Sequence, residues 1–199
     1  MTESRASGTG SERPVMTIDL DGVVCGPLLG QNLGIHQTLL DPEAPPPAGR
    51  AWPRWLGGPL DHLRFDLRRP LHGAQNALER LSQQRRLVLL TGRRSDPSYW
   101  LRWYGLESFY SQVVINEGAL KSPHHKLEQV ARLGAVEHVD DDGRTAQLLA
   151  NRSEARVYLC DWPRNRGIDL DPAVRRVANL EALADLIEGV DADGTLDRV

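Results

Sequence analysis

The 199-residue chain has few cysteines, no long apolar segment and no large excess of either charge. Its two cysteines, Cys25 and Cys160, do not form a CxxC pair, which argues against a disulfide framework or a zinc ribbon and favours a reducing compartment. The purely apolar runs, such as residues 87–90, are a few residues long, whereas a helix needs ~20 residues to cross a bilayer. We therefore expect a cytoplasmic protein without a membrane partner.

Three widespread site signatures are also absent. The chain contains no GxGxxG, no GxxxxGK[ST] and no GxSxG, which argues against nicotinamide binding, a phosphate-binding P-loop and a serine hydrolase. Lysine and arginine number 24 against 27 aspartates and glutamates, giving a net charge of −3. This balance does not provide the basic surface that tracks nucleic-acid phosphates, so nucleic acid is not an expected partner.

An apolar fraction of 40% is sufficient to bury a core within one compact domain. Short apolar runs alternate with segments of helical periodicity. We predict strands at residues 15–20, 87–91, 112–116, 136–139 and 156–160, and helices at residues 74–84, 98–104, 124–133, 144–151 and 180–188. This alternation favours an α/β protein, a three-layer Rossmann-like fold with a parallel central sheet over residues 15–189. Residues 1–14 are predicted to be a disordered lead-in, and residues 190–199 a tail.

A different composition marks residues 25–70, which hold eight of the thirteen prolines. Such a segment cannot be a regular helix, and we interpret it as a small cap inserted over one end of the sheet. Trp52 and Trp55 could stack on a base or pack the inside of this insertion. Three arginines in it either meet a second anionic group or face water: Arg64, Arg68 and Arg69.

Polar residues follow the predicted strands at the edge where an open parallel sheet binds its ligands. The first strand runs into Asp19-Leu20-Asp21-Gly22, the second into Thr91-Gly92-Arg93 and the fourth into Asp140-Asp141-Asp142. A lysine, Lys126 or the competing Lys121, lies near the start of a predicted helix. Adjacent His124 and His125 do not share a helix face and are expected at the surface.

This set of residues suits phosphoryl transfer. An ionised carboxylate such as Asp19 can attack phosphorus without an activating base, provided that a cation offsets the repulsion between the two anions. Mg²⁺ bound by Asp140 or Asp141 would do this, with Asp140 expected as the direct ligand. Asp21 could transfer protons, whereas the Thr91 hydroxyl, the Gly92 amide and the Lys126 ammonium could bind phosphoryl oxygens.

The ordered motifs resemble those of the haloacid dehalogenase (HAD) superfamily of phosphotransferases. The likeness covers residues 14–167 and rests on hydrophobic-DxDG at Asp19 and Asp21, TGR at Thr91, a helix-borne lysine at Lys126 and hydrophobic-DD at Asp140 and Asp141. Residues 99–106 and 159–166 are similar to the small 5′-nucleotidase-like branch, although Arg164 replaces the aromatic residue that follows proline in that branch.

The resemblance implies a Mg²⁺-dependent phosphatase that forms an aspartyl phosphate, with a small phosphorylated metabolite such as a nucleoside monophosphate as substrate. The implied catalytic residues are Asp19, Asp21, Thr91 and Lys126. The implied phosphate-binding residues are Leu20, Gly22, Gly92 and Arg93. The implied metal ligands are Asp19, Asp21, Asp140 and Asp141.

Several alternatives stay open. The tail repeats the first motif at Asp191-Ala192-Asp193-Gly194-Thr195, but too few residues follow it to supply the other motifs. Asp142 could cap a helix that starts near Arg144. A catalytically silent binding or regulatory module and a phosphatase acting on nucleic-acid ends are the competing functions. All four motifs are complete, which favours the enzyme.

Overall fold

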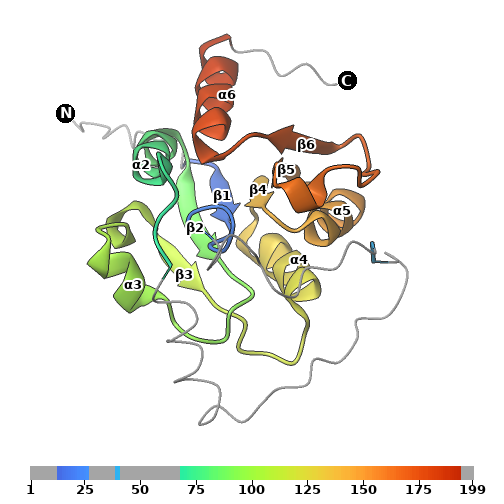
Figure 1. Cartoon of the computed structure of the whole chain (residues 1–199), viewed down its shortest axis with the longest axis horizontal. Coiled ribbons are helices and arrows are strands. Elements are labelled where there is room, and N and C mark those ends of the chain that lie inside the picture. Colours follow the sequence, from blue (N-terminus) through green and yellow to red (C-terminus); the bar gives the residue numbers. More distant parts are fainter. Residues whose placement is uncertain (1–12, 27–38, 41–67, 194–199) are drawn as a thin grey trace, which may run out of the picture.

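The computed structural model describes residues 13–26, 39–40 and 68–193 (Figure 1). Most of the expected cap at residues 25–70, including Trp52, Trp55 and Arg64, lies outside the described residues. So do residues 1–12 of the expected lead-in and residues 194–199 of the expected tail.

Six parallel strands form one sheet in the order β3-β2-β1-β4-β5-β6. Their bounds are β1 Val15–Ile18, β2 Arg86–Leu90, β3 Gln112–Val114, β4 Glu137–Asp140, β5 Arg156–Cys160 and β6 Val174–Val177. The five predicted strands are present, and β6 is an additional edge strand. The predicted α/β class with a parallel sheet is confirmed.

Helices cover both faces of the sheet, as Figure 1 shows. They are α2 Ala74–Gln84, α3 Ser98–Trp103, α4 Ser122–Leu133, α5 Gly143–Arg152 and α6 Leu180–Asp193, with short 3₁₀ turns η2 Glu107–Phe109 and η3 Pro163–Asn165. Helices α2 and α6 pack together over one face, and α4 and α5 over the other. The two apolar cores are therefore separated by the sheet, which gives three layers. None of the helices in the described part of the chain is both long and apolar enough to span a membrane.

Helices α4 and α6 differ from their predicted bounds by more than one residue at one end. Helix α6 continues to Asp193 rather than ending near residue 188. Extending a helix that has already formed is much easier than starting one, because each added residue gains a backbone hydrogen bond. Helix α4 begins at Ser122, and its first turn packs inward, so His124 and His125 are 9% and 6% exposed. The expectation that both histidines lie at the surface was wrong.

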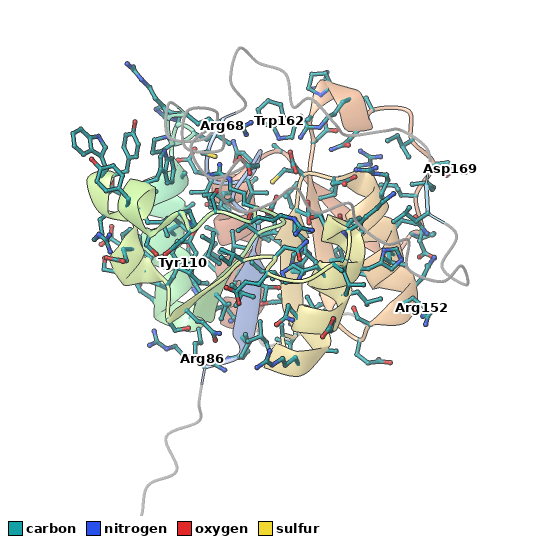
Figure 2. All side chains as sticks on the ribbon, turned by 90° about the horizontal axis from the view of Figure 1, so that it is seen from below. Arg68, Arg86, Tyr110, Arg152, Trp162 and Asp169 are labelled. Atoms are coloured by element: carbon teal, nitrogen blue, oxygen red, sulfur yellow. The ribbon has the colours of Figure 1, made fainter. Side chains whose placement is uncertain are left out.

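The strand order decides where the polar motifs meet. Strand β1 lies between β2 and β4, so the residues after these three strands share one end of the sheet. Figure 2 shows Arg68 and Trp162 at this end and Arg86 at the opposite one. The carboxyl ends of β1, β2 and β4 therefore form one continuous polar surface.

Candidate active site

A tight turn follows β1 and carries the first motif. The Asp19 N–H donates to the Val139 carbonyl (3.0 Å), and the Leu20 carbonyl accepts the N–H groups of Val24 (3.1 Å) and Cys25 (2.9 Å). The Leu20 side chain is fully buried in the core, so Leu20 could contact a substrate only through its backbone.

Gly22 is required in this turn for two reasons. Its φ of 82° lies in the left-handed region, which favours glycine. A Cβ at this position would also lie 1.8 Å from Asp141 Oδ2. The absence of a side chain at Gly22 therefore lets the carboxylate of the fourth motif approach the first motif.

Three buried aspartates, Asp19, Asp140 and Asp141, form a compact group in which one carboxylate oxygen of each lies within 4.8 Å of the others. Lys126 Nζ bridges two of them, at 2.9 Å from Asp19 Oδ1 and 2.7 Å from Asp140 Oδ2. Lys126 thus lies in the site, whereas Lys121 is exposed at the start of α4. Such a buried set of hard oxygen donors fits Mg²⁺, which prefers carboxylate ligands.

Burial and mutual repulsion set the protonation of this group. Burial raises the pKa of Asp19 to about 7, with Asp140 and Asp21 contributing and Lys126 opposing. The pKa of Asp140 is instead held low, because Lys126 and His138 outweigh the effect of burial. Burial lowers the pKa of Lys126, but Asp140 and Asp19 outweigh it, so the lysine stays charged.

Asp140 is held by four donors. Its Oδ1 accepts the N–H groups of Asp141 (2.8 Å) and Asp142 (2.9 Å), and its Oδ2 accepts Lys126 Nζ and His138 Nε2 (3.0 Å). His138 Nδ1 lies 2.8 Å from Thr17 Oγ1, which fixes the imidazole ring. Sequence reasoning missed His138 and Thr17. Both are polar residues within otherwise buried strands, and this pattern could have indicated a role in the site.

Asp21 lies apart from the three-aspartate group. Arg93 binds it with two contacts, Nε to Oδ2 at 2.7 Å and Nη2 to Oδ1 at 2.5 Å, and Arg68 Nη1 lies 2.5 Å from Oδ1. Although burial opposes the change, these arginines lower the pKa of Asp21. We expected Asp21 among the metal ligands; both of its carboxylate oxygens face guanidinium groups, and the carboxylates that cluster in the described part of the chain are those of Asp19, Asp140 and Asp141.

The second motif borders the same edge. The Thr91 N–H donates to the Val114 carbonyl (3.0 Å), and Thr91 Oγ1 accepts the Arg93 N–H (3.2 Å). A Cβ at Gly92 would lie 2.2 Å from Ser122 Oγ, so a glycine is needed where the TGR turn passes the start of α4. The loop after β2 and the helix that carries Lys126 are thereby held close together.

The loop after β5 closes over the aspartates. Trp162 Nε1 donates to the Gly22 carbonyl (2.7 Å), and Asn165 Nδ2 donates to the carbonyls of Asp141 (2.8 Å) and Cys160 (3.1 Å). The Arg164 guanidinium contacts Asp141 Oδ2. In the sequence, Arg164 stood out as a difference from the 5′-nucleotidase-like pattern that the chain resembles, but it was not predicted as a site residue.

Helix α5 begins immediately after the fourth motif. Asp142 is its N-cap and accepts the Arg144 N–H at 3.0 Å. The acidic run therefore performs two tasks, because Asp142 caps the helix while Asp140 and Asp141 face the site.

The formal charges of the site cancel when all its aspartates are ionised. Four carboxylates face four basic groups: Asp19, Asp21, Asp140 and Asp141 against Lys126, Arg68, Arg93 and Arg164. Two of the basic groups contact Asp21 and the other two contact the three-aspartate group, so the balance holds for the whole site while the three-aspartate group keeps one excess negative charge.

No protein-family profile matches the chain, and no curated protein sequence does. Its fold nevertheless matches solved structures of HAD-superfamily hydrolases. One is a subfamily IA hydrolase from Geobacter sulfurreducens, with a TM-score of 0.55 and 17% identity over 92% of this chain and 100% of that one. Another is a haloacid dehalogenase-like hydrolase from Xanthomonas campestris, with a TM-score of 0.58 and 13% identity over 92% and 98% of the two chains.

The L-2-haloacid dehalogenase from Xanthobacter autotrophicus is also similar, with a TM-score of 0.56 and 13% identity over 89% of this chain and 99% of that one. At these identities the likeness concerns the fold alone. The chain therefore has the fold of the HAD-superfamily hydrolases.

Proposed function

We propose that the protein is a Mg²⁺-dependent phosphomonoester hydrolase that acts through an aspartyl phosphate on Asp19. Its proposed substrate is a small phosphorylated metabolite such as a nucleoside monophosphate. One observation carries the proposal: a buried carboxylate at the end of β1 shares a lysine with a second aspartate and lies within 4.8 Å of a third.

In the first step, an Asp19 carboxylate oxygen attacks phosphorus, the bond to the leaving oxygen breaks, and the phosphoryl group is transferred to Asp19. Lys126, the Thr91 hydroxyl and the Gly92 N–H would bind the phosphoryl oxygens. Mg²⁺ held by Asp19, Asp140 and Asp141 would offset the charge of the two anions. The other formal charges of the site cancel, so a bound Mg²⁺ would give the site a net charge of +2. This charge is equal and opposite to that of a phosphomonoester dianion.

In the second step, water hydrolyses the aspartyl phosphate, and Asp21 would take its proton. Arg93 and Arg68 keep Asp21 ionised and therefore able to accept a proton, although the pKa that they lower makes it a weaker base. Because Asp21 is ionised before the first step, it has no proton to give at that point, so the leaving oxygen would depart as an alkoxide and take its proton from water.

The test is a hydrolysis screen with nucleoside monophosphates, sugar phosphates and nitrophenyl phosphate, each with and without Mg²⁺. We expect Mg²⁺-dependent phosphate release, and its loss in Asp19→Asn, because the amide cannot attack phosphorus. Asp161→Asn is the matched control, since Asp161 also follows a strand but pairs with exposed arginines. Wild-type turnover in Asp19→Asn would refute the covalent mechanism. A folded wild type that is inactive on the whole panel would favour a silent binding module.

A further inference from the structure

Arg164 brings a positive charge onto Asp141 from the loop after β5. Its guanidinium contacts Asp141 Oδ2, and its Cζ lies 5.2 Å from the centroid of the Trp162 ring. The side chain of Arg164 is 20% exposed and that of Asp141 is 4% exposed, so the pair is largely shielded from water. Asp141 also belongs to the group of aspartates that fits Mg²⁺. A guanidinium and a divalent cation therefore require the same carboxylate.

The backbone that carries Arg164 is anchored independently of this ion pair. Asn165, the next residue, is fully buried and donates to the carbonyls of Asp141 and Cys160. Arg176 Nη2 donates to the Asn165 carbonyl at 3.1 Å. Rotation about the side-chain bonds of Arg164 can therefore move its guanidinium from Asp141 without unfolding the loop.

We propose that Arg164 competes with Mg²⁺ for Asp141, and that the guanidinium displaced by the cation binds the phosphoryl oxygens of the substrate. The second part rests on the proposed phosphatase function. Like charges repel, so a divalent cation on Asp141 weakens the contact of Arg164 with that carboxylate. The planar guanidinium can bind two phosphoryl oxygens at once, and the Trp162 ring keeps it beside the site.

This proposal predicts effects of opposite sign. Removing the guanidinium removes a competitor of Mg²⁺, so the cation binds more tightly. It also removes a phosphate ligand, so phosphate binds more weakly. A residue that only shaped the loop would weaken both interactions, because both depend on the position of Asp141.

Calorimetric titrations of wild type and Arg164→Gln measure both quantities. The first titrates Mg²⁺, and the second titrates orthophosphate into Mg²⁺-saturated protein. We expect Mg²⁺ to bind Arg164→Gln about tenfold more tightly and phosphate about tenfold more weakly, a coupling typical of interacting sites. The control is Arg166→Gln, whose side chain on the same loop is 66% exposed and pairs with Asp161. It should leave both affinities unchanged.

Two further variants test the cause. In an Asp141→Asn background, adding Arg164→Gln should not change the Mg²⁺ affinity, because the shared carboxylate is gone. Arg164→Lys keeps a positive charge near Asp141, so its Mg²⁺ affinity should lie closer to that of wild type than that of Arg164→Gln does. An unchanged or weaker Mg²⁺ affinity in folded Arg164→Gln would overturn the competition. Unchanged phosphate affinity in Arg164→Gln would overturn the proposed binding of phosphoryl oxygens by Arg164. A wild type without phosphatase activity would also overturn that part, but the Mg²⁺ titrations would still decide whether Arg164 and Mg²⁺ compete for Asp141.

Discussion

Asp19 is a buried carboxyl group for which catalysis and folding stability favour opposite protonation states. As a nucleophile it must be ionised, yet burial raises its pKa from 3.8 to about 7. The folded protein therefore binds this proton more tightly than the unfolded chain does. The contribution of Asp19 to the free energy of unfolding is complete below about pH 4 and is lost as the pH rises to about 7.

Asp19→Asn removes this titration, so its stability relative to wild type should increase from pH 5 to pH 8. In buffer containing a chelator, we expect the difference in unfolding free energy to grow by about 2–4 kcal/mol over that interval. Chemical denaturation at the two pH values measures it. Asp161→Asn is the control and should show no comparable change. A pH-independent difference for Asp19→Asn would show that Lys126 keeps Asp19 ionised throughout.

Side-chain partners were the part of the site that the sequence could not predict. The positions of Asp19, Thr91 and Asp140 follow from the rule that parallel strands end at one edge. The guanidinium partners of Asp21 come from 47 and 72 residues away, and no local periodicity specifies such pairs. A DxDG motif therefore predicts where Asp21 lies but not that two arginines hold it.

Among the secondary-structure elements, strand β6 shows the limit of sequence patterns. Its buried Val174 and Val177 flank two exposed arginines, Arg175 and Arg176, which is too short and polar a run to stand out. Its pairing with β5 makes it a strand, and that pairing is a tertiary contact. The longer strands and amphipathic helices were predictable because each carries its own apolar pattern.

The turn after β1 offers a prediction at the scale of an element. Gly22 and Gly105 both have positive φ angles, 82° and 69°, so alanine strains the backbone at either position. Only at Gly22 would the new Cβ also collide with the Asp141 carboxylate, because nothing lies within 4 Å of a Cβ at Gly105.

Gly105→Ala should therefore cost about 1 kcal/mol of stability and keep full activity. Gly22→Ala should cost about 1–3 kcal/mol more and lose most of its turnover, since Asp141 must move. Thermal unfolding and the phosphatase assay distinguish the two variants. Equal stability and activity in both would mean that the close approach of Gly22 and Asp141 does not matter.

At the scale of the whole molecule, helices cover both faces of the sheet and enclose one apolar core on each side. The three-aspartate group lies outside these cores, at the carboxyl end of the strands. Repulsion among the three aspartates is offset by Lys126 and Arg164. Two single charges cannot fully neutralise three carboxylates, so the folded state should gain from a divalent cation that the unfolded chain does not bind specifically.

Mg²⁺ should therefore raise the unfolding temperature of the whole domain. At a concentration 100-fold above its dissociation constant, a cation that binds the native state alone stabilises it by ~2.7 kcal/mol. For a chain of this size that corresponds to a rise of about 5–10 °C in the midpoint. Scanning calorimetry with MgCl₂, and with KCl at equal ionic strength, measures the specific part of this shift. Asp141→Asn should reduce the MgCl₂ shift, because it removes a charged ligand while leaving the fold intact. An equal shift in KCl, or a full shift in Asp141→Asn, would place the bound cation elsewhere in the protein.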